Sequence, residues 1–180
     1  DPFRLFFLWQ GGLSFHGGLI GVIVSLYIFS IKQKISFLAL MDSTAVAMPI
    51  GLGLVRIGNF LNGELFGRPT NGEWGFIFPT DPLGIPRHPS QLYECFLEGI
   101  ILFFVLNYIA RQNVAKGVTA SALLIFYGLF RFIIEFFRQP DIHIGLMAFD
   151  LSMGQILSLP MMIIGLVLVV VFQRNNATIS

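Results

Sequence analysis

Five long apolar stretches constrain this chain more than any other feature of its sequence. They span residues 13–31, 35–55, 91–110, 118–137 and 151–172. A helix needs about 20 apolar residues to cross the hydrocarbon core of a bilayer, and each stretch comes close to that length. Of the 180 residues, 55% are hydrophobic and only 12% are charged, which is typical of a membrane protein rather than a soluble domain. The sequence therefore predicts an all-α, polytopic transmembrane helix bundle in which residues 1–180 form a single domain.

The basic residues between the stretches predict the orientation of the bundle. Because the chain crosses the membrane once per stretch, five of them fall on one side, namely Lys32, Lys34, Arg111, Lys116 and Arg174. Lysine and arginine accumulate in cytoplasmic loops, so we expect this side to face the cytoplasm. Residues 58–90 then form a small periplasmic cap between the second and third helices, rich in Gly, Pro and turn pairs. The alternation of Trp74, Phe76 and Phe78 within this cap favours a short hairpin strand.

Several classes of function are disfavoured. The formal net charge is +1 and no basic stripe is present, so nucleic acid is not expected as a partner. The single cysteine, Cys95, excludes an internal disulfide and any CxxC motif. The three histidines lack metal-binding spacing, so we expect no metal site. The first residue is Asp1 rather than Met, and we expect the chain to lack its natural start.

A polar cluster ends the second apolar stretch. The sequence RIGNFLNGELFGRP, residues 56–69, combines arginines, asparagines and a glutamate with three glycines. Guanidinium groups and exposed backbone N–H donors bind anions. We therefore expect one side of a site for an anionic lipid head group here, built from Arg56, Asn59, Asn62 and Glu64.

A second polar group lies on one face of the fourth predicted helix. Tyr127, Arg131 and Glu135 are spaced four residues apart. Arg131 precedes Phe137 by six residues, which places it about 9 Å below the membrane surface. Arg131 and Glu135 could form a structural ion pair, because buried ions pair readily. The presence of Arg56 near the same surface favours a phosphate clamp instead.

His16 is the best general-base candidate among the residues near the outer surface. It lies in SFHGGLIG, residues 14–21, on the same side as Arg56 and Arg131. A lone histidine is more often a structural group, and Gly17 and Gly21 form a GxxxG pair whose usual role is helix packing.

Four stretches occur in order along nearly the whole chain and together resemble one protein family. They are SFHGGLIG (14–21), RIGNFLNGELFG (56–67), HPSQLYE (88–94) and YGLFRFIIEFFRQPD (127–141). They resemble the phosphatidylglycerol-prolipoprotein diacylglyceryl transferases of bacterial inner membranes. That family has seven transmembrane helices, so the resemblance implies that this chain supplies the last five and is N-terminally truncated.

The resemblance implies a transferase of lipoprotein biosynthesis. Such an enzyme transfers the diacylglyceryl group from phosphatidylglycerol to the lipobox cysteine in the signal peptide of a prolipoprotein, forms a thioether and releases glycerol phosphate. His16 or Tyr127 would take the thiol proton, while Arg56 and Arg131 would stabilise charge on the phosphate. Asn59, Asn62 and Glu64 would bind the head group, Glu135 would hold Arg131, and no cofactor would be required. The alternative is a polytopic transporter or lipid-binding membrane subunit, in which polar residues would continue through both leaflets.

Overall fold

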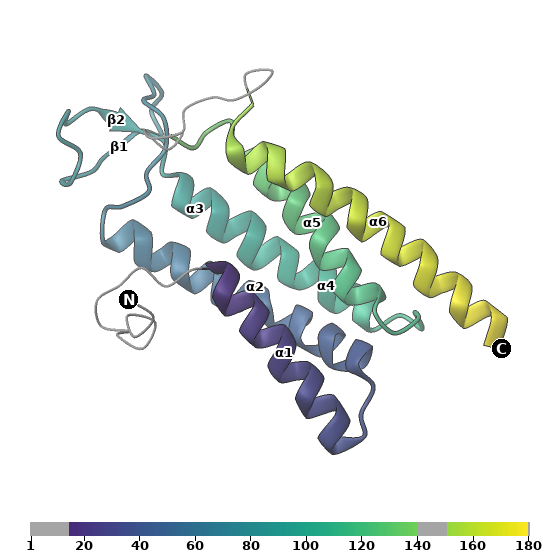
Figure 1. Cartoon of the computed structure of the whole chain (residues 1–180). Coiled ribbons are helices and arrows are strands. Elements are labelled where there is room, and N and C mark those ends of the chain that lie inside the picture. The colour runs from purple at the N-terminus through teal and green to yellow at the C-terminus, as the bar shows by residue number, and fades with distance from the viewer. Residues whose placement is uncertain (1–14, 140–150, 180) are drawn as a thin grey trace. The chain divides into compact units, whose positions relative to one another are not determined.

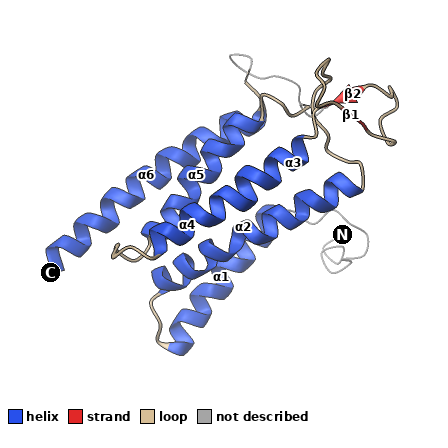
Figure 2. Ribbon diagram, turned by 180° about the vertical axis from the view of Figure 1, so that it is seen from behind, coloured by secondary structure: helices blue, strands red, loops and turns tan. Residues whose placement is uncertain are grey.

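The computed structural model describes residues 15–139 and 151–179, with side chains described for residues 17–139 and 151–175. In chain order the elements are α1 (Phe15–Gln33), α2 (Phe37–Leu61), β1 (Phe76–Ile77), β2 (Pro86–Arg87), α3 (Ser90–Glu94), the π-helix η3 (Cys95–Ile101), α4 (Leu102–Ala110), α5 (Val118–Ile134) and α6 (Met153–Ile179) (Figure 1). The chain divides into two compact units, residues 1–41 and 42–180. Figure 2 shows how little of the described chain is strand.

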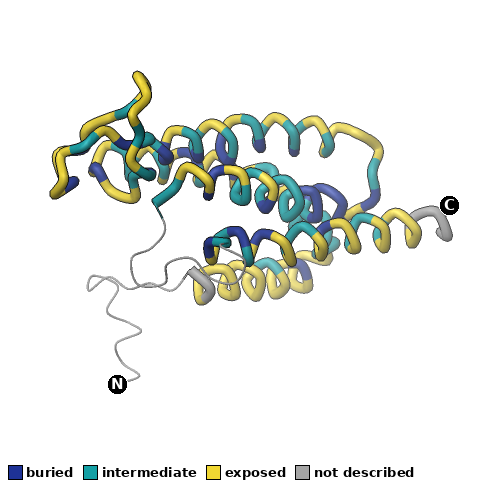
Figure 3. The backbone as a smooth tube through the Cα atoms, turned by 90° about the horizontal axis from the view of Figure 1, so that it is seen from above, coloured by how far each residue is buried: buried dark blue, intermediate teal, exposed yellow. Residues whose placement is uncertain are grey.

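The helices confirm the predicted helical membrane bundle. Within the described residues, three helices are long and apolar enough to cross a membrane: Phe37–Leu61, Ser90–Ala110 and Met153–Asn175. The second of these is α3, η3 and α4 in continuous succession. Gly17–Gln33 and Val118–Ile134 are shorter apolar helices. Many large apolar side chains of the three long helices are exposed, including those of Leu54, Phe104 and Val167. Figure 3 shows exposed positions recurring along the helix that leads to the C-terminus. Such surface is stable against lipid.

Small residues bring α5 and α6 into close contact along their lengths. A Cβ atom on Gly165 would lie 2.8 Å from the carbonyl oxygen of Ser121, and one on Gly128 would lie 3.0 Å from that of Ser158. Packing through glycine and serine is usual between membrane helices, because lipid provides no hydrophobic force to join them. The two helices run antiparallel in Figures 1 and 2.

An acidic side chain caps the N-terminus of α5. This contact lies at one end of the second unit, residues 42–180, and we expect that end to face the cytoplasm. The two carboxylate oxygens of Asp42 on α2 accept hydrogen bonds from the backbone N–H groups of Gly117 and Ala120, at 2.7 and 2.8 Å. These groups have no acceptor within the helix, and the helix N-terminus favours negative charge. Asp42 therefore joins the start of α5 to α2.

Residues 62–89 fold into a cap between α2 and α3. The predicted hairpin is confirmed as a two-stranded antiparallel sheet in which Phe76 pairs with Arg87 and Ile77 with Pro86. Phe78 is buried and packs against Phe60, Phe66 and Phe76.

One buried ion pair and one backbone bridge fix the cap in place. Arg87 donates to both carboxylate oxygens of Asp81, with its Nε 2.6 Å from Oδ2. These hydrogen bonds hold the pKa of Asp81 below its ordinary value of 3.8. A bridge between Gly67 and Arg138 joins the cap to the segment after α5.

Candidate functional site

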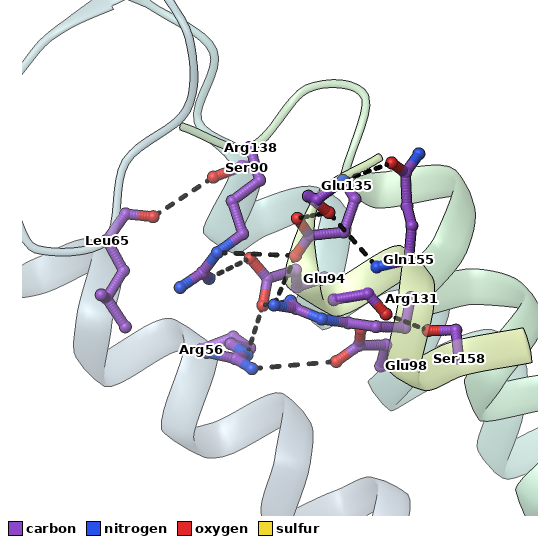
Figure 4. A network of polar contacts seen from close by, with 12 residues as sticks. Arg56, Leu65, Ser90, Glu94, Glu98, Arg131, Glu135, Arg138, Gln155 and Ser158 are labelled. Carbon is purple, nitrogen blue, oxygen red and sulfur yellow. Dashed lines mark hydrogen bonds and ion pairs between the residues drawn. The ribbon is translucent and has the colours of Figure 1, made fainter. Parts of the chain in front are cut away.

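Three arginines and three glutamates meet at the end of the second unit that adjoins the cap (Figure 4). They come from α2, from the α3–η3 segment, and from α5 and the residues just after it. We call this set the arginine–glutamate network; its members are Arg56, Glu94, Glu98, Arg131, Glu135 and Arg138. Arg56 comes from the last part of α2, Glu94 ends α3, and Arg131 lies in the last turn of α5. All six side chains are at least four-fifths buried.

Glu94 is the centre of the network. Its Oε2 atom lies 2.7 Å from Nε of Arg56 and 3.3 Å from an Nη atom of Arg131, while its Oε1 atom accepts from Arg138 at 3.1 Å. The side chain is completely buried. An ionised carboxylate offers about four acceptor sites, so one glutamate can hold three guanidinium groups together.

Glu135 fixes Arg131 from the other side. One of its oxygens lies 2.5 Å from the second Nη atom of Arg131, and the other accepts a 2.6 Å hydrogen bond from the Ser152 hydroxyl. Ser152 and Gln155 form a reciprocal capping box at the start of α6, because each side-chain oxygen accepts the other residue's backbone N–H. The N-terminus of α6 therefore positions Glu135, and through it Arg131.

Glu98 differs from the other two glutamates. It is completely buried in the middle of η3, yet neither carboxylate oxygen has a hydrogen-bond partner among the described residues. Its closest cation is Arg56, at 4.0 Å. The next residue, Gly99, packs so closely on α2 that a Cβ there would lie 2.9 Å from Cα of Gly53.

The predicted head-group residues form a short chain of contacts that starts at the network. Arg56 donates to the side-chain oxygen of Asn59 at 3.5 Å, and the amides of Asn59 and Asn62 donate to Glu64 at 2.9 and 3.3 Å. The hydrogen bond from Asn59, followed by that from Asn62, lowers the pKa of Glu64 below its ordinary value of 4.5. Glu64 therefore stays ionised near neutral pH and orients both amides.

The turn that carries Glu64 is attached to the start of α3. Gly63 and Leu65 adopt positive φ angles of 66° and 57°, which reverse the chain after α2. Gln91 donates to the carbonyl oxygen of Glu64 at 2.7 Å, and the Ser90 hydroxyl donates to that of Leu65 at 3.2 Å. The asparagines are thus held beside the helix that provides Glu94.

An apolar groove lies next to the network. A cavity of about 370 Å³ between the α3–η3 segment and α5 is lined by Tyr93, Phe96, Leu97, Ile133, Ile134 and Phe137. These residues neighbour Glu94 and Glu135 in the sequence. A buried charged cluster and an apolar groove therefore lie side by side, which suits an amphiphilic ligand.

The structure brings together most, but not all, of the site residues expected from the sequence. Arg56, Arg131 and Glu135 meet in the network, and the Arg131–Glu135 ion pair that the spacing allowed is present. Tyr127 lies one turn before Arg131 and packs against the core of Leu102, Leu106 and Ala122. The side chain of His16 lies outside the described residues, so its expected role stays a prediction.

Sequence reasoning places Glu94, Glu98 and Arg138 with the other ionisable residues at the outer end of the helices, but it assigns them no individual role. The signal that identifies the glutamates is their spacing, four residues apart, at the start of an otherwise apolar stretch. A charge within a transmembrane helix needs a partner, but the sequence does not say which arginine supplies it.

Comparison with known proteins identifies the family. The model of the prolipoprotein diacylglyceryl transferase family matches residues 1–171. The chain belongs to this family. The family predicted from the four sequence stretches is therefore confirmed.

Individual relatives in this transferase family are similar over almost the whole chain. A phosphatidylglycerol–prolipoprotein diacylglyceryl transferase of Geobacter sulfurreducens is 52% identical over 97% of this chain and 67% of its own length. Proteins of the same name from Aeromonas hydrophila and Mannheimia succiniciproducens are 53% and 49% identical, over 94% and 100% of this chain and 61% and 67% of their own lengths. The chain therefore spans about two thirds of the length of these relatives.

Proposed function

We propose that the protein containing this chain transfers the diacylglyceryl group of phosphatidylglycerol to the lipobox cysteine of prolipoproteins. The observation that carries this proposal is the convergence of Arg56, Arg131 and Arg138 on one buried carboxylate, beside an apolar groove. Each guanidinium has five N–H donors, so donors remain for a phosphate after the contacts with glutamate. The charged network suits the phosphate, and the groove suits an acyl chain.

The reaction is a nucleophilic displacement at one carbon of the diacylglyceryl group, the carbon that is bonded to the phosphate oxygen. The substrate thiolate forms the carbon–sulfur bond, and the carbon–oxygen bond to the phosphate breaks, which yields a thioether and glycerol phosphate. The thiol has an ordinary pKa of about 8.5 and attacks as thiolate, so a nearby base accelerates the step. His16 and Tyr127 are the two proposed bases.

The phosphate gains negative charge as it changes from a diester to a monoester. Arg56 and Arg131 stabilise this charge, because preorganised donors in a site without water act strongly in the transition state. Asn59 and Asn62, oriented by Glu64, bind the glycerol head group. Glu135 holds Arg131 in position.

The location follows from the charges at the two ends of the bundle. The network lies at the cap end, opposite the end that carries Arg111 and Lys116. By the positive-inside rule, the site opens to the periplasmic leaflet of the bacterial inner membrane, where it meets phosphatidylglycerol and the signal peptide.

The transporter alternative is disfavoured by the apolar core of the second unit. A buried apolar cluster lies between the network and the start of α5, where Asp42 binds: Leu102, Leu106 and Ala122. Phe126 and Phe130 pack against them. A substrate path through both leaflets requires polar groups at this depth.

Release of glycerol phosphate tests the proposed function. The full-length gene product in detergent is supplied with phosphatidylglycerol and a lipobox peptide. We expect release that requires the peptide thiol and that falls by at least about 10²- to 10³-fold in Arg56→Ala. Arg111→Ala, at an exposed position far from the network, is the matched control and keeps the wild-type rate. Release that does not depend on the thiol contradicts the proposal.

Two further variants separate the proposed bases. Full turnover of His16→Gln at neutral pH excludes His16, and full turnover of Tyr127→Phe excludes Tyr127.

A further inference from the structure

Glu98 is a buried carboxyl group that accepts no hydrogen bond from the part of the chain that the structure describes. Its side chain is fully buried and both oxygens lack hydrogen-bond partners among the described residues. Glu94, one turn earlier, contacts three arginines, and Glu135 contacts two arginines and a serine hydroxyl. An isolated ionised carboxylate in an apolar interior is far less stable than a paired one, and it becomes neutral instead. Glu98 is therefore the glutamate of the network whose negative charge the described residues stabilise least.

The backbone that carries Glu98 packs closely against α2. Glu98 occupies the middle of η3, and π-helical turns are frequent at functional sites. Gly99 and Gly53 bring the backbones of η3 and α2 into contact, with no room for a Cβ on Gly99. The backbone of Glu98 is therefore fixed against α2, and its carboxyl group lies 4.0 Å from the guanidinium group of Arg56.

The net charge of the network indicates when one of its glutamates must carry a proton. With every group ionised, the three arginines balance the three glutamates. A bound phosphodiester adds one negative charge to a site that excludes water, and an excess buried charge is costly. If one glutamate is neutral, the three arginines balance the two remaining carboxylates and the phosphate.

We propose that Glu98 is protonated when the site holds an anionic lipid phosphate, so that this proton couples lipid binding to pH. The inference rests on the proposed function and assigns Glu98 as a positioning and charge-balancing residue rather than a catalytic one. The charged and titratable groups that face Glu98 come from each element packed around it. They are Arg56 on α2, Glu94 on α3, Tyr127 and Arg131 on α5, and Arg138 after α5.

The pH dependence of KM for phosphatidylglycerol tests this coupling. If binding requires a proton on Glu98, KM of the wild type rises above the pH at which Glu98 ionises, by up to about tenfold per pH unit. Glu98→Gln is permanently neutral, so its KM stays flat over the same range. Glu98→Asp keeps a titrating carboxyl group, so its KM still rises with pH. A purely structural role would change KM in both variants without changing its pH dependence.

Glu73→Gln is the matched control, because it neutralises an exposed carboxylate outside the network. We expect it to keep the wild-type kcat/KM and the wild-type rise of KM with pH. An unchanged pH dependence in Glu98→Gln overturns the inference. If the wild type itself releases no glycerol phosphate, the proposed function fails instead.

Infrared difference spectroscopy provides a second measurement that needs no turnover. Adding phosphatidylglycerol to the wild-type protein should produce the carbonyl stretch of a neutral carboxyl group, and Glu98→Asp should shift that band. A spectrum without any carboxyl band on lipid binding contradicts the proposal, even if the Glu98→Gln variant does not fold.

Discussion

The Nε atom of Arg56 lies 2.7 Å from Oε2 of Glu94, although the entire cap separates the two residues in the chain. Glu94 is fully buried and also contacts Arg131 and Arg138. One carboxylate therefore joins the ends of α2, α3 and α5.

Glu94→Gln should destabilise the bundle strongly. The change keeps the size of the side chain but leaves three guanidinium groups without their shared anion. Removing one partner of a buried ion pair typically costs about 3 to 5 kcal/mol. We expect a loss in this range in the free energy of unfolding, measured by titration with a denaturing detergent. Glu73→Gln, at an exposed position in the cap, is the control and should unfold like the wild type.

Replacement of Arg131 separates charge from geometry. A lysine keeps the positive charge but lacks the planar fork that contacts Glu94 and Glu135 at once. We expect Arg131→Lys to reduce the rate of lipid transfer by about 10²-fold, and Arg131→Ala to abolish transfer without preventing membrane insertion. The rates are measured as glycerol phosphate release, with Arg111→Lys as the control. Normal activity of Arg131→Ala would remove this residue from the phosphate clamp.

The contact between Gly53 and Gly99 should tolerate no added methyl group. A Cβ on Gly99 would lie 2.9 Å from Cα of Gly53, and neither backbone can move independently of its helix. Overpacking of this kind costs about 1 to 3 kcal/mol. Gly51→Ala is the control on α2, because nothing lies within 4 Å of its Cβ position. Thermal unfolding in detergent should show a lower midpoint for Gly99→Ala, and equal midpoints for the two variants would contradict the prediction.

Ser152→Ala should weaken both the start of α6 and the hold on Glu135. The hydroxyl accepts from Gln155 N–H and donates to Glu135, so the variant loses a helix cap and a buried hydrogen bond. Loss of an N-cap costs about 1 kcal/mol. A double-mutant cycle of Ser152→Ala with Glu135→Gln measures the coupling, which should differ clearly from zero. Additive effects on stability would show that the two side chains act independently.

The cap should lose stability in acid through the Asp81–Arg87 pair. Hydrogen bonds from Arg87 hold the pKa of Asp81 below 3.8, so the folded cap binds a proton less readily than the unfolded chain does. The stabilisation is therefore complete above the unfolded pKa and is lost as the pH falls through the lower, folded value. The protection factor of the Leu83 amide, whose N–H donates to Asp81, should fall over that range. In Asp81→Asn this protection factor, which is corrected for the intrinsic pH dependence of exchange, should be lower at neutral pH and nearly independent of pH.

The sequence was sufficient to predict the helical architecture. Apolar stretches of membrane length leave the backbone no stable alternative to helices in lipid. The described helices begin within two residues of the predicted starts, although α2 and α6 extend further than predicted, and the structure confirms the hairpin in the cap. Local spacing also predicted which residues share a helix face, as the Arg131–Glu135 pair shows.

Only the tertiary structure decided which charges meet. The contacts of Glu94 with Arg56 and Arg131 depend on how α2, α3 and α5 cross, and that crossing depends on the backbone contact between Gly53 and Gly99. No periodicity within one helix encodes such a contact. That Glu98 has no hydrogen bond among the described residues is likewise a property of the assembled network, because a carboxylate in an apolar stretch carries no sign of which arginine will reach it. The sequence determined that charges enter the membrane, and the packing of the helices determined which of them are neutralised.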